Sequence, residues 1–161
     1  MTRIRLIGLY QILSMSIDLE VLNNSPLLQN MSNYQRRKAI LISELHEFEK
    51  GELLVEQDTI GRNMHLILSG EAEVIRKDVD ESRSLAILKP GQVFGEVGYI
   101  RETERTANVV ATEKVSALRF DYERMEKDLK FFPNIVAKLN FNISHILGER
   151  LADMVAKSRN K

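Results

Sequence analysis

The sequence contains no cysteine and no tryptophan, and only three of its 161 residues are histidine. Without cysteine, the chain can form no disulfide and no thiolate metal site or nucleophile. His46, His65 and His145 lie far apart and include no His-x-His pair, so we expect no metal site. No serine stands in a recognisable nucleophile elbow. We therefore expect no catalytic residues and no enzymatic activity.

An excess of charge of either sign is also missing. Lysine and arginine total 23, aspartate and glutamate also total 23, and the formal net charge is zero. This balance does not indicate a basic nucleic-acid-binding surface. Hydrophobic residues make up 43% and charged residues 29% of the chain, as in ordinary soluble globular domains.

Long apolar runs are absent too, and no stretch is continuous enough to cross a bilayer. The apolar positions near the N-terminus are interrupted by polar residues, and no cleavage site of a signal peptide follows them. Their spacing instead predicts an amphipathic helix built on Leu6, Leu9, Leu13 and Ile17. We expect a cytoplasmic protein that does not contact a membrane.

Glycines punctuate the centre of the chain: six of the eight lie between Gly51 and Gly98, among alternating and β-branched residues. This pattern is typical of short strands joined by tight turns. The sequence predicts a mainly β domain of the double-stranded β-helix (jelly-roll) type with flanking helices. The predicted strands cover residues 53–56, 64–68, 72–76, 85–88, 106–112 and 115–121.

Both flanks of this β region have helical patterns. We divide the chain into an N-terminal helical extension (1–24), a β-roll with short helices (25–132) and a long C-terminal helix (133–161). Ser32 and Gln35 fit a capping box, and that helix is expected to continue through Leu45. A short helix over 122–129 precedes the C-terminal one, giving a helix pair.

The C-terminal helix carries an apolar stripe at helical spacing. Packing on the chain's own β region and pairing with a second copy explain this stripe equally well, and one helix can do both. Its members are Val136, Leu139, Ile143, Ile146, Leu147, Leu151, Met154 and Val155.

The segment 93–111, VFGEVGYIRETERTANVVA, carries the most chemical information. Gly95 and Gly98 permit close approach of the backbone to a bound group, and the start of a short helix offers amides to an anion. An inward-pointing Arg105 needs an anionic partner, and its planar guanidinium fits a phosphate. Glu96 can accept hydrogen bonds from a sugar hydroxyl. From spacing alone, however, a simple internal Glu96–Arg105 ion pair is the favoured interpretation.

This segment resembles the phosphate-binding cassette of cyclic-nucleotide-binding domains, of both the catabolite-activator and the kinase regulatory-subunit type. The similarity extends over residues 25–154, and the nine-residue spacing from Glu96 to Arg105 matches the kinase regulatory subunits. The resemblance implies that Glu96 binds the ribose 2′-hydroxyl, that Arg105 binds the cyclic phosphate, and that backbone amides complete the site. The ligand-binding residues that it predicts are Phe94, Gly95, Glu96, Val97, Gly98, Arg105, Thr106 and Ala107.

The resemblance implies a sensor for cAMP or cGMP that needs no cofactor and signals through movement of its C-terminal helix (133–161), which can pair in a dimer or cap the base of the ligand. The partner is expected to be a second copy or a separate output protein. Thr106 fits the pattern of cGMP-binding relatives, whereas the general bacterial character favours cAMP slightly. No helix-turn-helix follows the last helix, so direct DNA binding is not expected. The alternative is an interaction or scaffold module that keeps the fold but no longer binds the nucleotide.

Overall fold

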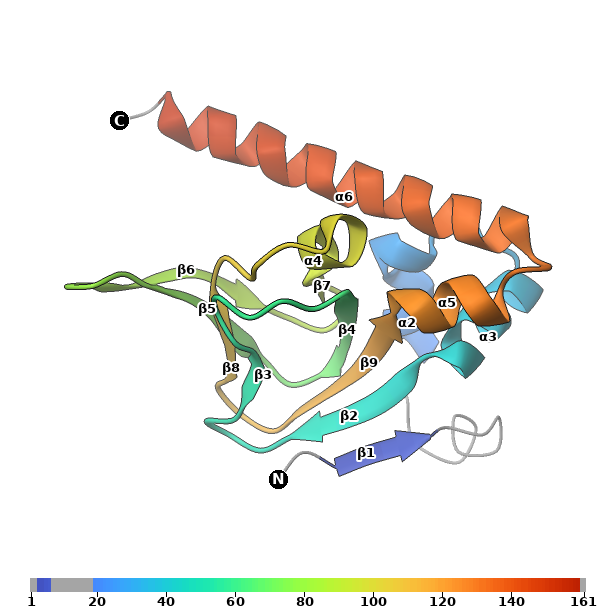
Figure 1. Cartoon of the computed structure of the whole chain (residues 1–161), viewed down its shortest axis with the longest axis horizontal. Helices are drawn as coiled ribbons and strands as arrows, with labels where there is room; N and C mark the ends of the chain where they lie inside the picture. The colour runs from blue at the N-terminus through green and yellow to red at the C-terminus, as the bar shows by residue number, and fades with distance from the viewer. Residues whose placement is uncertain (1–2, 7–18, 160–161) are drawn as a thin grey trace.

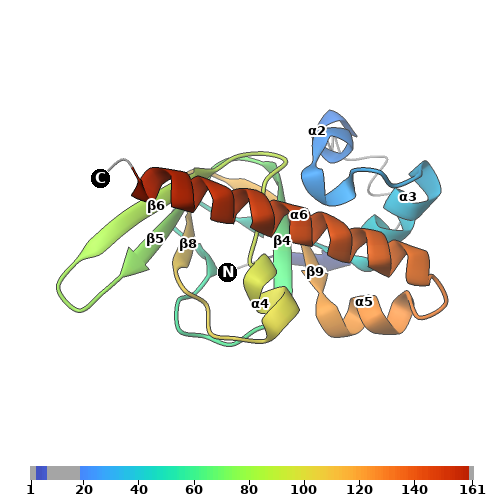
Figure 2. The same ribbon diagram turned by 90° about the horizontal axis from the view of Figure 1, so that it is seen from above.

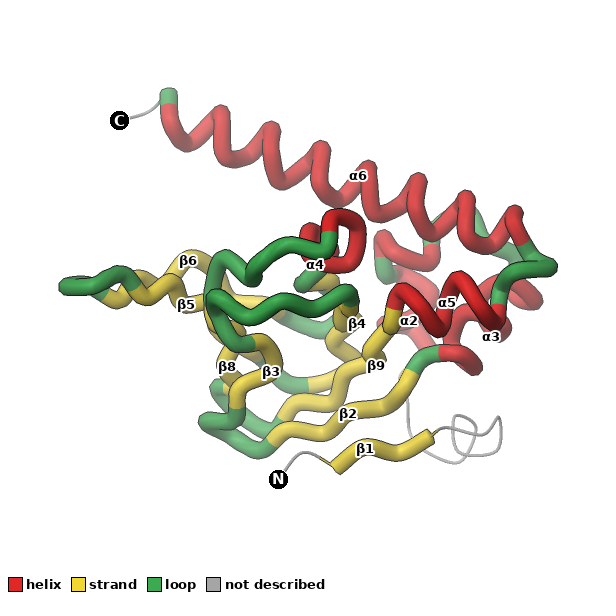
Figure 3. Tube along the Cα trace, in the orientation of Figure 1, coloured by secondary structure: helices red, strands yellow, loops and turns green. Residues whose placement is uncertain are grey.

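The computed structural model of the chain describes residues 3–6 and 19–159. Two antiparallel sheets face each other in a β-roll, most of the short helices gather at one end, and one long helix crosses above (Figure 1). Figure 3 shows the same division, with the strands in the roll and most of the helical chain beside and above it. The arrangement confirms the predicted mainly β jelly roll with flanking helices.

The described strands form one five-stranded and one four-stranded sheet. The first has the order β1 (Arg3–Leu6), β2 (Glu44–Phe48), β9 (Val115–Asp121), β4 (Asn63–Ser69) and β7 (Val93–Phe94). The second has the order β3 (Leu53–Val55), β8 (Asn108–Ala111), β5 (Ala72–Lys77) and β6 (Ser82–Leu88).

Strand β9 separates two hydrophobic clusters because successive side chains of a strand point to opposite faces. Leu118 lies opposite Leu45 and Leu66, and these three belong to the cluster beneath the helices. Its neighbour Ala117 lies opposite Ile67, and both belong to the cluster inside the roll. A shift of one residue in register would exchange the two faces, so both clusters fix the pairing.

The helices before the roll are α2 (Leu19–Asn24), the 3-10 turn η1 (Pro26–Leu28) and α3 (Asn33–Ile42). The predicted capping box of α3 is present: the Gln35 amide donates to Ser32 Oγ at 3.3 Å, and the Ser32 amide donates to Gln35 Oε1 at 2.9 Å. The prediction that this helix continues through Leu45 is wrong. Ser43 donates from both its amide and its hydroxyl to the Ile40 carbonyl and ends the helix, and Leu45 then enters β2.

The predicted helical extension over residues 1–24 is wrong at its start. Residues Arg3–Leu6 form strand β1, which pairs with β2 from Arg3 opposite Glu47 to Leu6 opposite Glu44. These four residues alternate between charged and apolar, and β2 offers backbone groups along its outer edge that a further strand can pair. Only α2 is helical among the described residues of this region. Leu9, Leu13 and Ile17 lie outside the described residues.

After the roll, α5 (Tyr122–Asp128) and α6 (Pro133–Ser158) form the predicted C-terminal helix pair. The first half of α6 packs on the chain itself: Ile135, Leu139, Ile143 and Ile146 are buried in the cluster beneath the helices. Asn142 fixes this half by donating to the carbonyls of Leu27 and Gln29. The second half differs, because every residue from 151 to 159 is exposed. The predicted apolar stripe is therefore divided between a packed half and an exposed half.

Two histidines lie buried inside the roll. The His65 ring on β4 stacks on Phe94, with ring centroids 4.9 Å apart and planes at 7°, and His46 lies edge-on to it. Burial lowers the pKa of His65 well below its ordinary value, and His46, Arg119 and Arg105 lower it further. Burial also lowers the pKa of His46, although its hydrogen bond to Glu44 opposes this. Both rings are therefore neutral in the folded protein at neutral pH.

The lowered pKa values of His46 and His65 predict that acid destabilises the fold. Below a pH of about 6.5 the unfolded chain binds protons that the folded chain does not, so the free energy of unfolding falls with decreasing pH. One such group contributes a slope of at most about 1.4 kcal/mol per pH unit. Urea unfolding between pH 7 and pH 5 measures it. His65→Phe keeps the ring stack and should flatten the curve, whereas His145→Ala, at an exposed position of α6, should not. A His65→Phe curve as steep as that of the wild type would contradict this account.

Candidate ligand-binding site

A cavity of about 410 Å³ lies between the four-stranded sheet, the 93–111 segment and the second half of α6. Figure 2 shows α6 from above, running over α4 (Glu96–Arg101) and on toward the β5–β6 hairpin. The sheet supplies an apolar wall that includes Val74 and residues 85–88. The α6 residues that line the cavity are Arg150, Asp153, Met154 and Lys157, whose spacing places them on one face of the helix.

All eight residues predicted from the sequence line this one cavity. The chain leaves β7 at Phe94, turns at Gly95 into α4, and returns to the cavity at Arg105 before β8 begins. This path brings Glu96 and Arg105 to the same site although nine positions separate them. Both are buried, with exposed fractions of 4% for Glu96 and 7% for Arg105. Their role in ligand binding stays a prediction.

Two glycines make room for the Arg105 side chain. Gly95 has a φ of +79°, in the left-handed region that favours glycine. A Cβ atom on Gly98 would lie 2.4 Å from Arg105 Nη1 and 2.9 Å from the Gly61 carbonyl oxygen. The guanidinium therefore packs directly against a backbone surface that no other residue type leaves open.

The Arg105 guanidinium is held by neutral acceptors. Its Nη1 donates to the Gly95 carbonyl at 2.8 Å, and its Nη2 donates to the carbonyl and Oδ1 of Asn63 at 2.7 and 3.1 Å. These bonds use three of its five N–H donors. Within the described part of the chain, Arg105 forms no ion pair, so the simple Glu96–Arg105 pair is not observed. Burial lowers the pKa of Arg105, Glu96 raises it and Arg119 lowers it. A positive charge thus lies buried without an acid in contact.

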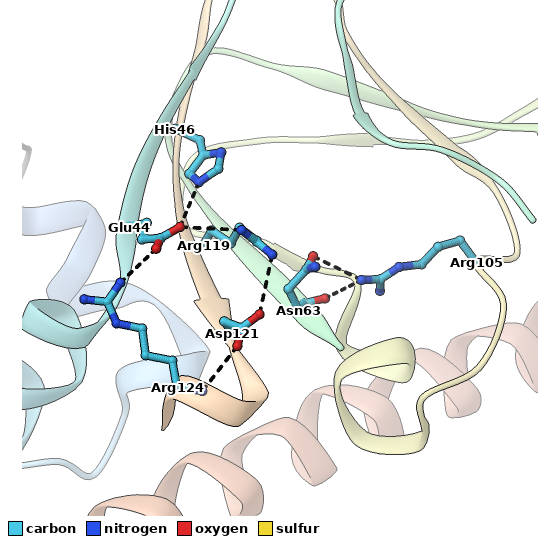
Figure 4. A network of polar contacts seen from close by, with 7 residues as sticks. All are labelled: Glu44, His46, Asn63, Arg105, Arg119, Asp121 and Arg124. Atoms are coloured by element: carbon cyan, nitrogen blue, oxygen red, sulfur yellow. Dashed lines mark hydrogen bonds and ion pairs between the residues drawn. The ribbon is translucent and has the colours of Figure 1, made fainter. Parts of the chain in front are cut away.

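The nearby guanidinium of Arg119, unlike that of Arg105, has acidic partners. Arg119 of β9 lies 3.5 Å from Glu44 and 3.4 Å from Asp121, and Glu44 also binds Arg124 at 2.8 Å (Figure 4). Asn63 lies between this acid-rich network and Arg105 in the same view. The chain therefore neutralises Arg119 with its own carboxylates and leaves Arg105 beside the cavity.

Sequence reasoning missed the partner of Glu96. Arg150 of α6 donates from Nη1 to Glu96 Oε1 and from Nη2 to the Val93 carbonyl. The spacing of the polar residues on α6 indicated that they share one face of the helix. It did not indicate which element that face contacts. Asn63 was missed as well, because its contact with Arg105 joins positions 42 residues apart.

Among residues 3–6 and 19–159, no three His, Cys, Asp or Glu side chains are grouped so as to hold a metal ion. The described helices include none with the length and apolar character needed to cross a membrane.

The sequence profile described as "Cyclic nucleotide-binding domain" matches residues 45–130, which is more than half of the chain. The chain belongs to the cyclic nucleotide-binding domain family. This confirms the resemblance drawn from the 93–111 segment. The members of this family are regulatory domains and generally not catalytic.

The relatives include regulatory and receptor proteins. The chain is 35% identical to a cAMP-dependent protein kinase regulatory subunit of Eremothecium gossypii, over 60% of this chain and 20% of the relative. It is 28% identical to the Cyclic AMP receptor protein of Thermus thermophilus, over 73% of this chain and 56% of the relative. The chain thus spans between a fifth and just over half of the length of these curated relatives.

Solved structures agree with the fold. The Catabolite Activator Protein of Thermus thermophilus has a TM-score of 0.75 at 25% identity, covering 84% of this chain and 62% of that one. A cyclic nucleotide-binding domain from Methylobacillus flagellatus has a TM-score of 0.77 at 21% identity, covering 86% and 79%.

The contact between Gly98 and Arg105 predicts that a larger residue at position 98 destabilises the fold. Gly98→Ala forces a methyl group into the guanidinium and the Gly61 backbone, so the free energy of unfolding should fall by about 1–3 kcal/mol. Gly148→Ala is the matched control, because nothing lies within 4 Å of its added Cβ and an exposed helix gains about 0.5–1 kcal/mol from alanine. Urea unfolding measures both, and equal effects of the two substitutions would contradict the packing described.

Proposed function

We propose that this chain is a non-catalytic sensor domain that binds a cyclic nucleotide in the cavity beside Arg105. The observation that carries the proposal is the buried guanidinium with only neutral hydrogen-bond partners. A buried charge without a counter-charge is costly, and a phosphodiester supplies both the negative charge and acceptors for the remaining N–H donors. The family to which the chain belongs supports the same ligand.

The remaining walls suit the other parts of such a ligand. Glu96 offers a buried carboxylate that can accept hydrogen bonds from a ribose hydroxyl. The apolar wall of β5 and β6 suits a purine ring, and the cavity volume falls within the range of small-molecule sites. We propose cAMP ahead of cGMP, because the relatives reported above are named for cAMP. Thr106 lies exposed on the cavity wall and could favour guanine.

The signal is proposed to pass from α4 to α5 and α6. Arg62 donates to the Tyr99 carbonyl of α4 at 3.5 Å and lies 3.2 Å above the Tyr122 ring, at the start of α5. Tyr99 and Tyr122 also meet edge-on, with centroids 5.3 Å apart. A ligand that draws α4 toward its phosphate would therefore move α5 and shift the population of α6 positions.

The output partner is proposed to meet the exposed half of α6. Leu151, with an exposed fraction of 62%, lies there beside Met154 and Val155. We propose that this surface pairs with a second copy or with a separate output protein in the cytoplasm, without direct DNA contact. The size of the protein in solution at high concentration distinguishes a dimer from a monomer that needs another partner.

One observation favours the second candidate, an interaction module that no longer binds a nucleotide. Arg150 already occupies the Glu96 carboxylate that a ribose would need. Direct measurement of nucleotide binding separates the two functions.

Isothermal titration with cAMP and with cGMP tests the proposal. The wild type should bind, and Arg105→Lys should bind roughly 10-fold to 100-fold more weakly, because an ammonium cannot replace the two-pronged contact of a guanidinium. Arg83→Lys, at an exposed position of the β5–β6 hairpin, is the matched control and should bind as the wild type does. If the wild type takes up neither nucleotide at millimolar concentration, the interaction module is the better description.

A further inference from the structure

Two stretches of the chain carry positive charge and no negative charge. Residues 21–43 and residues 129–148 contain neither aspartate nor glutamate. Their cations are Arg36, Arg37, Lys38, Lys130 and Lys138. The whole chain has as many acidic as basic residues, so the acids that balance these cations lie in other segments.

The fold brings the two stretches together at the end of the molecule that lies away from the β5–β6 hairpin (Figure 2). Lys138 of α6 donates to the carbonyl of Asn30, which precedes α3. The Lys38 ammonium of α3 lies 4.8 Å from the centre of the Phe132 ring, in the turn between α5 and α6. Helix α3, this turn and the start of α6 therefore form one continuous surface, although they lie far apart in the sequence.

Large aromatic side chains are exposed on this surface. Phe131, in the turn between α5 and α6, is 84% exposed, and Tyr34 of α3 is 56% exposed. Phe141 is 64% exposed and lies one turn beyond Lys138 on α6. Exposed apolar side chains that are surrounded by polar ones mark an interaction surface. We call it the aromatic–basic surface, and its members are Tyr34, Arg37, Lys38, Lys130, Phe131 and Phe141.

The charge of this surface is available to an anionic partner. Glu126 and Asp128 of α5 are the last acids before the turn, and each already binds a neighbouring residue of the same helix. Arg37 and Lys130 are exposed, and neither forms an ion pair with another described residue.

We propose that the aromatic–basic surface binds the anionic face of a lipid bilayer. Acidic headgroups attract lysine and arginine, and aromatic rings are stable in the region between the headgroups and the acyl chains. The charge pattern fits a membrane better than a protein partner, because a membrane presents negative charge over a wide area and repels acids from the whole contact. The cavity lies beside the second half of α6, so docking through α3 and the start of α6 leaves it open.

This surface is not visible in the sequence. No membrane contact was expected there, because the chain has no long apolar run. The aromatic–basic surface contains no such run either, since it forms only where α3 meets the turn between α5 and α6. The proposed attachment is to the membrane surface and needs no spanning helix.

A single tryptophan at position 131 tests the contact, because the chain has no other tryptophan. The emission of Phe131→Trp should shift to the blue with vesicles of equal parts phosphatidylcholine and phosphatidylserine, and should not shift with phosphatidylcholine alone. Val79→Trp, at the fully exposed tip of the β5–β6 hairpin, is the matched control and should shift with neither. A shift of both variants, or of neither, would overturn the proposal.

Vesicle sedimentation tests the charge. Arg37→Glu and Lys130→Glu should each bind the same anionic vesicles at least roughly 5-fold more weakly than the wild type, because each cation near such a surface contributes about this factor. Arg83→Glu makes the same change at the opposite end of the molecule and should bind as the wild type does. Equal losses in all three variants would show attraction by total charge alone and contradict a defined surface.

Poly-L-glutamate separates a membrane from an acidic protein partner. If it shifts the emission of Phe131→Trp and the anionic vesicles do not, the surface binds protein, and the membrane proposal is overturned. None of the four substituted positions lines the cavity, so these results do not depend on nucleotide binding. Circular dichroism confirms that each variant is folded, and the two charge reversals lie on separate elements, so either one alone provides the comparison.

Discussion

The structure around the cavity depends on one buried charge, the guanidinium of Arg105. Taking a cation out of water without an anionic partner is costly, and the neutral acceptors of Gly95 and Asn63 offset only part of this cost. The same end of the roll does hold carboxylates, but Glu44 and Asp121 bind Arg119 and Arg124 instead. The fold thus keeps one positive charge available beside a cavity, as an anion-binding site requires.

Residues from several elements of the fold hold the Arg105 guanidinium in place. Strand β4 supplies Asn63, the turn after β7 supplies the Gly95 carbonyl, and Gly98 leaves the space in which the guanidinium lies. The apolar wall of β5 and β6 closes one side of the cavity and α6 crosses another. Arg150 joins α6 to Glu96, so the position of the helix is physically connected to the wall of the cavity.

Local patterns predicted six of the described strands (β3, β4, β5, β6, β8 and β9), the capping box at Ser32 and eight of the ten residues of the 93–111 segment that line the cavity. They could do so because period-two alternation, capping and glycine turns are encoded by neighbouring residues. The features that the sequence did not predict depend on contacts between residues far apart in the chain. Arg3–Leu6 became a strand because β2 offered an edge, and Leu45 became part of β2 because β9 paired with it. The Arg150–Glu96 contact joins positions 54 residues apart, and no sequence period predicts such a meeting.

A crystal structure of the chain grown with cAMP tests most directly whether Arg105 binds a phosphodiester. We predict that the cyclic phosphate lies within hydrogen-bond distance of the Arg105 guanidinium and that the ribose lies at Glu96. An empty cavity in crystals saturated with the nucleotide, or a nucleotide bound with its phosphate away from Arg105, would contradict it.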